Sequence, residues 1–280
     1  MKLISWNTNA RRNTEAQARA LLARRPDIVG LQEVTARSVD VWVEALKAGG
    51  LLHVRSTVAG SADVRRGPHA YGVLIASGYP LGDQARMSFP VPGWNEKALS
   101  LLIDTPLGEL AMHTVHVPNG SANGWAKVEV LEAVFAGVSG HCGDRHTLLC
   151  GDFNTPQCEL PSGEVVTWAQ DVNDSGRVRL VSRILGGSGQ RWDTAERNIV
   201  CGLQPFAMRD VFRSLHRYNV DACSWVLRQK ERERRRRFDH IFASDQLKTI
   251  SCEYLTAWLN ERLSDHAGIE AVFEAGVQAS

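Results

Sequence analysis

The sequence predicts an α/β fold in which two packed β-sheets are flanked by helices. Short apolar runs typical of strands alternate along the chain with amphipathic stretches typical of helices. A chain of 280 residues, 44% of them hydrophobic, can bury a substantial core. No repeat or low-complexity linker divides it, so we expect one domain over residues 1–280. Residues 156–204 are polar and rich in glycine, and we expect an insertion or flap there.

The first fifty residues predict strand, helix, strand and helix in that order. We expect a strand at 2–6, a helix at 15–25 that Pro26 ends, a buried strand at 27–31, and a helix at 38–47 that Gly49 and Gly50 stop. The second of these strands delivers Gln32 and Glu33 at its C-terminal end.

The rest of the chain is richer in strands. Strands at 70–76, 97–104 and 109–117 suggest a sheet meander, with a turn at 105–108 between the last two. A helix at 123–138 and an apolar strand at 147–150 follow, and further strands are expected at 224–227, 238–242 and 269–273.

Composition and charge exclude several classes of protein. The apolar runs are far shorter than the roughly 18 residues that span a bilayer, so we expect no membrane insertion. The six cysteines form no C-x-x-C pair, which argues against a zinc or redox motif. A strand-like pattern directly after Met1 leaves no space for a secretory leader, so we expect a cytoplasmic protein, and no obligate protein partner is indicated. The net charge of +1 means that any attraction to nucleic acid must come from local clusters.

Acidic and amide side chains follow two of the predicted strands. Glu33 ends an apolar strand, where a carboxylate is either exposed to solvent or satisfied by a cation. Asp152 and Asn154 follow the strand at 147–150 and point to the same side of an extended segment, although an Asx turn explains that pattern equally simply.

Two imidazole motifs lie near further predicted strands. Asp239 and His266 are candidates for a carboxylate and imidazole pair, which leaves Asp265 to face a metal. The alternative for the Ser-Asp-His motif is a helix cap or a turn. His113 and His116 would face opposite sides of one strand, so at most one reaches the site, and we favour His116 because it is nearer the strand end. The alternative is a plain surface or core histidine.

Taken in order, these motifs resemble the endonuclease/exonuclease/phosphatase superfamily, which includes exonuclease III, abasic-site endonucleases and DNase I. The resemblance spans most of the chain. It rests on Ser5-Trp6-Asn7, Leu31-Gln32-Glu33-Val34, Val117-Pro118-Asn119, Gly151-Asp152-Phe153-Asn154, Phe238-Asp239 and Ser264-Asp265-His266. It implies a DNase I-like four-layered α/β sandwich with two packed mixed β-sheets and the site at one rim.

The resemblance also implies a role for each matching residue. Glu33 would be the principal metal ligand, with Asn7 and Asp265 close to the ion, which would be Mg²⁺ or Mn²⁺ because the site is lined by oxygen. Asp152 would position or deprotonate the attacking water, and Asn154 would orient the water or the phosphate. His266, polarised by Asp239, would donate to the phosphate, and Asn119 would contact the same phosphate.

Two departures from the abasic endonucleases argue against a dedicated abasic-site role. Those enzymes carry a tyrosine at the position of His116, whereas DNase I-like and lipid-cleaving relatives have a histidine nearby, which suggests a general acid for the leaving oxygen. Asn9 stands where they have an aspartate, and we group it with the substrate-binding residues.

A basic run at 230–237 leads into the strand that carries Asp239. It is either the solvated turn of a hairpin or a source of guanidinium groups for phosphate, in which case Arg235, Arg236 and Arg237 contact the substrate. Three tryptophans, Trp94, Trp125 and Trp225, are either stacking surfaces or core residues.

The sequence therefore predicts a Mg²⁺-dependent phosphodiesterase that acts on nucleic acid. A DNA endonuclease or exonuclease is the leading hypothesis, and DNA is favoured over RNA as the substrate. The alternative is a phosphoesterase for a small or lipid-linked ester, such as a phosphoinositide, sphingomyelin or a nucleotide. A binding module without activity is disfavoured because nearly every expected catalytic residue is present.

Overall fold

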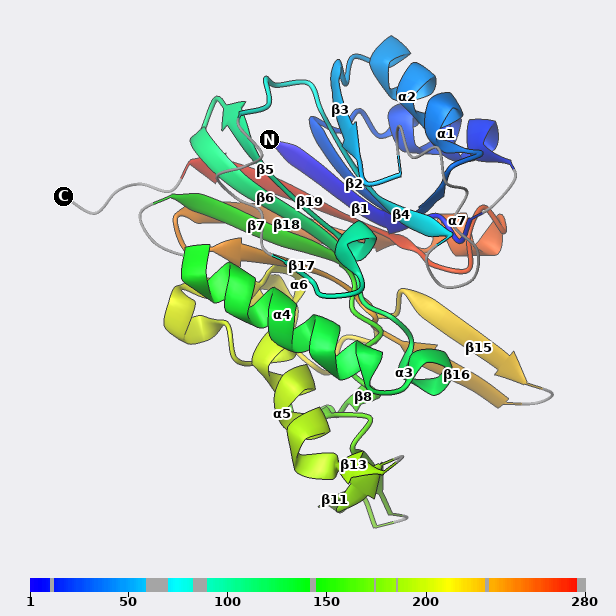
Figure 1. Ribbon diagram of the computed structural model, residues 1–280, viewed down its shortest axis with the longest axis vertical. Helices are drawn as coiled ribbons and strands as arrows, with labels where there is room; N and C mark the ends of the chain where they lie inside the picture. The colour runs from blue at the N-terminus through cyan, green and yellow to red at the C-terminus, as the bar shows by residue number, and fades with distance from the viewer. Residues whose placement is uncertain are drawn as a thin grey trace.

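Two mixed β-sheets form the centre of the computed structural model of the protein (Figure 1). The structure describes residues 1–10, 13–58, 70–82, 90–141, 145–173, 175–184, 186–229 and 232–275. Lys230 of the basic run and Cys142 lie outside these residues. In the described part of the chain, no helix has the length and apolarity needed to cross a membrane.

The first sheet has six strands and contains both ends of the described chain. Its strand order is β18 (Leu247–Leu255), β19 (Gly268–Ala275), β1 (Lys2–Asn7), β2 (Ile28–Thr35), β4 (Tyr71–Ser77) and β3 (His53–Ser56). Only β1 and β2 pair in parallel, and the other neighbours are antiparallel.

The second sheet has five strands and comes mostly from the middle of the chain. Its order is β14 (Met208–Asp210), β17 (Asp239–Ser244), β7 (His146–Asp152), β6 (Gly108–His116) and β5 (Ala98–Thr105). The β6 and β7 strands pair in parallel, so Asp152 and His116 end neighbouring strands at the same edge.

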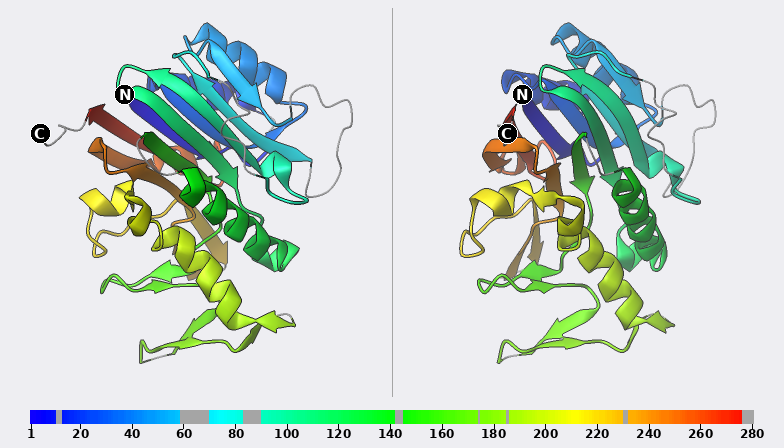
Figure 2. Two further views of the ribbon diagram at one scale, coloured as in Figure 1. Left: turned by 60° about the vertical axis from the view of Figure 1, so that its left-hand side comes forward. Right: turned by 90° about the vertical axis from the view of Figure 1, so that its left-hand side faces the viewer.

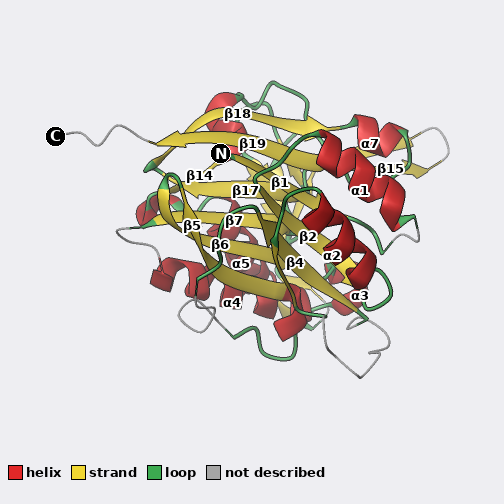
Figure 3. Ribbon diagram, turned by 90° about the horizontal axis from the view of Figure 1, so that it is seen from above, coloured by secondary structure: helices red, strands yellow, loops and turns green. Residues whose placement is uncertain are grey.

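Helices cover the outer face of each sheet, which gives four layers (Figures 1 and 3). Helices α1 (Thr14–Ala23) and α2 (Val39–Ala48) pack on the first sheet, while α4 (Ala126–His141) and α5 (Gly189–Val200) pack on the second. A third apolar cluster lies between the two sheets. The predicted α/β sandwich is therefore confirmed. Strands such as β4 are buried on both faces, which explains why they appear in the sequence as continuous apolar runs.

Short elements connect these layers. They are α3 (Gly120–Asn123), α6 (Val211–Leu215), α7 (Ala257–Asn260), the 3₁₀ turns η3 (Asn95–Lys97) and η4 (Gln204–Phe206), and the hairpin of β15 (Trp225–Gln229) and β16 (Arg232–Arg236). The sequence pattern missed β3, β14, β18, α5 and most of β16, and the expected meander is wrong because β4 lies in the first sheet while β5 and β6 lie in the second. The β18 strand lies at a sheet edge with only three buried residues, and β16 consists of charged residues, so neither shows an apolar run.

The polar segment at 156–204 forms three two-stranded ribbons before α5. These are β8 (Cys158–Glu159) with β9 (Val165–Val166), β10 (Gln170–Val172) with β11 (Val178–Leu180), and β12 (Arg183–Ile184) with β13 (Gly187–Ser188). The ribbons lie at one end of the molecule, beyond the second sheet (Figure 2).

A buried ion-pair network fixes this segment to the second sheet. The Arg237 guanidinium, 5% exposed, donates to Glu159 at 2.6 Å and to Asp210 at 2.7 Å. Arg213 donates to the same Glu159 carboxylate at 2.6 Å. Burial alone would raise the pKa of Glu159, but the two guanidinium groups outweigh burial and hold that pKa at about 2.

We predict that Glu159→Gln destabilises the protein in a pH-dependent way. The pKa of Glu159 is lower in the folded protein than its ordinary value of 4.5, so its stabilising effect is complete above pH 4.5 and is lost as the pH falls towards 2. The shift corresponds to about 3 kcal/mol. Urea unfolding of the wild-type protein and the variant, from neutral pH down towards pH 2, measures the difference between their free energies of unfolding. A difference that does not change with pH would contradict the account.

Candidate active site at the edge shared by the two sheets

A cleft of about 640 Å³ opens where the ends of the two sheets meet. Most of the acidic, amide and imidazole residues predicted from sequence line it: Glu33, His116, Asn119, Asp152, Asn154, Asp265 and His266. They come from segments far apart in the chain, so only the folded topology brings them together.

Three neighbouring strands of the second sheet place one functional residue each at this edge. The register aligns His116 with Asp152 and Asp152 with Asp239, so the three side chains belong to adjacent strands β6, β7 and β17. Gly151 precedes Asp152 with φ +143°, and a Cβ there would lie 1.9 Å from the carbonyl oxygen of Val115. Glycine is therefore required for β7 to approach β6 closely enough to position Asp152.

The first sheet contributes Asn7 and Glu33. A bulge interrupts the pairing of β2 between Gln32 and Val34, and Glu33 has a left-handed backbone with φ 57°. The Asn7 amide donates to Glu33 at 3.2 Å and to Asp152 at 2.9 Å, so one side chain links carboxylates of both sheets. The backbone N–H of Asn9 donates to the side-chain oxygen Oδ1 of Asn7 at 2.9 Å, which fixes the orientation of the side-chain amide.

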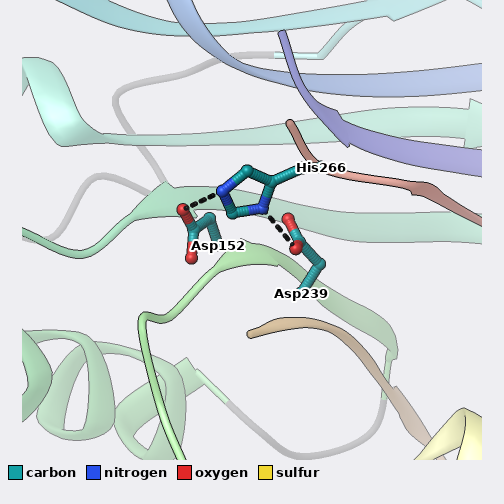
Figure 4. A group of neighbouring side chains, drawn as sticks. All are labelled: Asp152, Asp239 and His266. Carbon is teal, nitrogen blue, oxygen red and sulfur yellow. Dashed lines mark hydrogen bonds and ion pairs between the residues drawn. The ribbon is translucent and has the colours of Figure 1, made fainter. Parts of the chain in front are cut away.

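His266 lies between two carboxylates (Figure 4). Its Nδ1 is 2.7 Å from Asp239, and its Nε2 is 3.8 Å from Asp152. Burial would lower the pKa of His266, but the charges of Asp239 and Asp152 outweigh burial and raise the pKa to about 10. The imidazole is therefore protonated at neutral pH and carries a positive charge into the cleft.

The carboxylates of the cleft are costly to ionise where they lie. Burial raises the pKa of Asp152 to about 7 and raises that of Glu33, and the charge of Asp265 raises the pKa of Glu33 further. One oxygen of Asp265 is buried and has no hydrogen-bond partner among the described residues. A cation ligated by oxygen would satisfy these groups.

His116 faces the same carboxylates, at 3.6 Å from Glu33 and 3.8 Å from Asp152. Burial, with the charges of Lys97 and His266, lowers the pKa of His116 well below its ordinary value, so the ring is neutral. This favours a hydrogen-bond donor over the charged general acid expected from sequence. His113, three residues earlier, contacts Ser100 at 2.8 Å and does not line the cleft.

The amide residues at the rim are held by local bonds. The backbone N–H of Asn154 donates to Asp152 at 2.9 Å, and its side chain donates to the carbonyl of Val117 at 2.9 Å. Asn119 caps α3, where its side chain accepts from the N–H of Ser121. Asn9, which we expected to contact substrate, does not line the cleft, and its backbone N–H bonds the Asn7 side chain.

The basic run forms strand β16, in which the arginines alternate between two faces. Arg234 and Arg236 line the cleft opposite Leu227 and Trp225 of β15. Arg235 faces away and pairs with Asp221 at 3.1 Å, while the guanidinium of Arg237 is enclosed by the buried network. Of the three predicted arginines, Arg236 therefore lines the cleft and the other two do not, while Arg234 lines it without having been predicted.

A lysine and several tryptophans complete the lining of the cleft. Lys97 is buried, and its amine donates to the carbonyl of Tyr71 at 2.7 Å. Burial lowers the pKa of Lys97 to about 8. Trp94 and Trp225 line the cleft, whereas Trp125 packs against Trp192 with ring centroids 5.2 Å apart. Trp168, which the sequence analysis did not single out, also lines the cleft.

Comparisons with known proteins agree with this arrangement. The model of the Endonuclease/Exonuclease/phosphatase family matches residues 4–266, and the chain belongs to that family. No curated protein sequence matches it.

Similar solved structures share the fold. One is D. rerio TDP2 complexed with a single-strand DNA product, at 18% identity and a TM-score of 0.66 over 98% of this chain and 99% of that one. An AP endonuclease from Archaeoglobus fulgidus has 17% identity and a TM-score of 0.66 over 98% and 100%. A 3′-5′ exonuclease from Neisseria meningitidis has 21% identity and a TM-score of 0.61, also over 98% and 100%.

We predict that Gly151→Ala lowers the free energy of unfolding by about 2 kcal/mol or more, because the added methyl group meets backbone and the φ angle disfavours alanine. Gly140→Ala is the matched control. Gly140 lies in α4 with open space around it, and alanine there should raise the free energy of unfolding by at most about 1 kcal/mol. Urea unfolding measures both variants, and equal effects at the two positions would contradict the role assigned to Gly151.

Proposed function

We propose that the protein is a metal-dependent phosphodiesterase that cleaves nucleic acid, with DNA as the preferred substrate. The observation that carries this proposal is the convergence of Asn7 and His266 on Asp152, whose carboxylate lies 2.9 Å from the Asn7 amide and 3.8 Å from Nε2 of His266. The pair of Asp152 and positively charged His266 provides a proton acceptor and a donor for phosphate oxygen in one cleft.

Glu33 and Asp265 are the proposed metal ligands, and Asn7 holds Glu33 in place. The oxygen donors suit Mg²⁺ or Mn²⁺. Ligand atoms of Asp152, Asp239 and His266 also lie within 4.8 Å of one another. We favour Glu33 and Asp265 over that cluster because Nδ1 of His266 and a carboxylate oxygen of Asp239 already bond each other at 2.7 Å. When bound, the metal would neutralise charge that develops on the phosphate.

The remaining residues act on the water and the phosphate. Asp152 accepts the proton of the attacking water, and the Asn7 amide and the Asn154 backbone keep its carboxylate in place. His266, oriented by Asp239, donates to a phosphate oxygen that gains negative charge. His116, whose Nε2 lies 3.6 Å from Glu33, has a neutral ring that would donate a hydrogen bond to the substrate on that side of the cleft.

Nucleic acid is favoured over a small or lipid ester by the cleft rim. Arg234 and Arg236 present guanidinium groups to the cleft, and four tryptophans line it as well: Trp94, Trp168, Trp192 and Trp225. The D. rerio TDP2 structure holds a single-strand DNA product, which is a precedent for such a substrate on this fold.

The direct experiment incubates the purified protein with supercoiled plasmid, single-stranded RNA and a chromogenic phosphodiester, each with Mg²⁺ or with EDTA. We expect Mg²⁺-dependent cleavage of DNA that EDTA abolishes. Cleavage of the small ester alone would end the nuclease proposal, and the absence of cleavage of every substrate would favour a binding module.

We predict that Asp152→Asn and His266→Gln each lower kcat by roughly 100- to 10,000-fold while circular dichroism stays unchanged. Each change removes a group that acts on the transition state and leaves its volume nearly intact. Arg235→Ala is the matched control, because Arg235 faces away from the cleft and should retain full turnover. Retained turnover in Asp152→Asn would refute the proposed base.

We predict that Mg²⁺ or Mn²⁺ raises the Tm of the protein and that Asp265→Asn abolishes this shift, whereas Asp239→Asn keeps it. A ligand that binds only the folded state at about 100 times its Kd stabilises it by about 2.7 kcal/mol. Differential scanning fluorimetry with EDTA as the blank measures the shift. If Asp239→Asn abolishes the shift and Asp265→Asn keeps it, the metal site would be assigned to Asp152, Asp239 and His266 instead.

A further inference from the structure

Trp168 is the one exposed tryptophan in the described part of the chain. It is 39% exposed and lines the cleft beside Asn154. Single exposed apolar side chains are common on protein surfaces and need no function. This one differs because it lies inside the candidate active site and because both its backbone and its ring are held in place.

Two hydrogen bonds hold Trp168. Its indole N–H donates to the carbonyl of Asn154 at 3.0 Å, and its backbone N–H donates to Glu196 at 2.9 Å. Glu196 is fully buried and also binds Lys127 at 2.5 Å and Thr155 at 2.8 Å. The ring is therefore fixed against the segment that follows Asp152, and little conformational entropy remains to be lost when a ligand packs on it.

Basic groups lie near the ring. The Arg236 guanidinium carbon lies 5.6 Å and the Lys127 amine nitrogen 5.8 Å from the ring centroid, and Arg234 lines the same cleft. Trp225 lies across from Arg236 in the hairpin. An aromatic surface beside basic side chains matches a ligand with alternating flat rings and phosphates. A cationic headgroup such as choline fits poorly, because these positive charges would repel it.

We propose that Trp168 is a stacking platform for an unpaired nucleobase next to the scissile phosphate, and that the substrate is a single-stranded nucleic acid. This inference rests on the proposed function. A base inside a duplex stacks on its neighbours and cannot also stack on a side chain, so the platform selects strands whose bases are free. Arg234 and Arg236 contact the phosphates on either side, and the base contact needs no metal.

The test compares two fluorescein-labelled oligomers of equal length by fluorescence anisotropy in EDTA. One is a short oligothymidylate, and the other is a chain of abasic tetrahydrofuran nucleotides with the same phosphates and no bases. The wild-type protein should bind the oligothymidylate roughly 5- to 100-fold more tightly. Trp168→Ala should reduce that preference to near one while Trp168→Phe keeps most of it, and Arg235→Ala should keep all of it.

Equal affinity of the wild-type protein for the two oligomers overturns the inference, as does a preference that survives in Trp168→Ala. Because Trp168→Phe retains an aromatic ring, its preference shows that the effect comes from stacking and not from lost folding. Arg236→Ala should lower the affinity for both oligomers by the same factor, since the Arg236 side chain is proposed to contact phosphate.

Cleavage of the same oligothymidylate with Mg²⁺ separates this inference from the proposed function. A base preference without cleavage leaves the platform intact and contradicts the phosphodiesterase. Cleavage without a base preference supports the phosphodiesterase and contradicts the platform.

Discussion

The candidate site depends on one side chain that joins the two sheets. Asn7 ends a strand of the first sheet, and its amide donates both to Glu33 of its own sheet and to Asp152 of the other. The two carboxylates repel each other, and each resists ionisation because it is buried. A shared donor stabilises their charged forms, and it sets the distance between the group that would hold a metal and the group that would accept a proton.

The rest of the fold keeps this junction in place. The bulge in β2 turns Glu33 towards the cleft. Gly151 lets β7 approach β6 closely just before Asp152, whose side chain lines the cleft. His266 lines the cleft from the segment before β19, which places its ring against Asp239. Each of these features is a local departure from regular strand geometry, and such departures are frequent where a site needs a defined orientation.

The sequence predicted the layers and most of the site because each depends on local pattern. Strands buried on both faces appear as apolar runs, and Glu33, Asp152 and Asp239 adjoin such runs. The contact between Asn7 and Asp152 could not be predicted from local pattern, since it joins residues 145 positions apart. The two faces of β16 were missed for a related reason. A run of arginines does not indicate a strand, nor which of its side chains point to the same face. The sequence therefore predicted Arg235 and Arg237 in the cleft and did not predict Arg234. Trp168 lies in a polar segment whose ribbons are only two or three residues long, and nothing in that pattern indicates which side chain faces the cleft.

The most direct test of the central claim is a crystal structure of the protein with Mn²⁺ and a phosphorothioate oligonucleotide that resists cleavage. The account predicts one anomalous peak that contacts both Glu33 and Asp265, with a phosphate oxygen within hydrogen-bonding distance of His266 and a water beside Asp152. A peak bound by Asp239 and His266, or a phosphate that lies away from the edge where the two sheets meet, would contradict it.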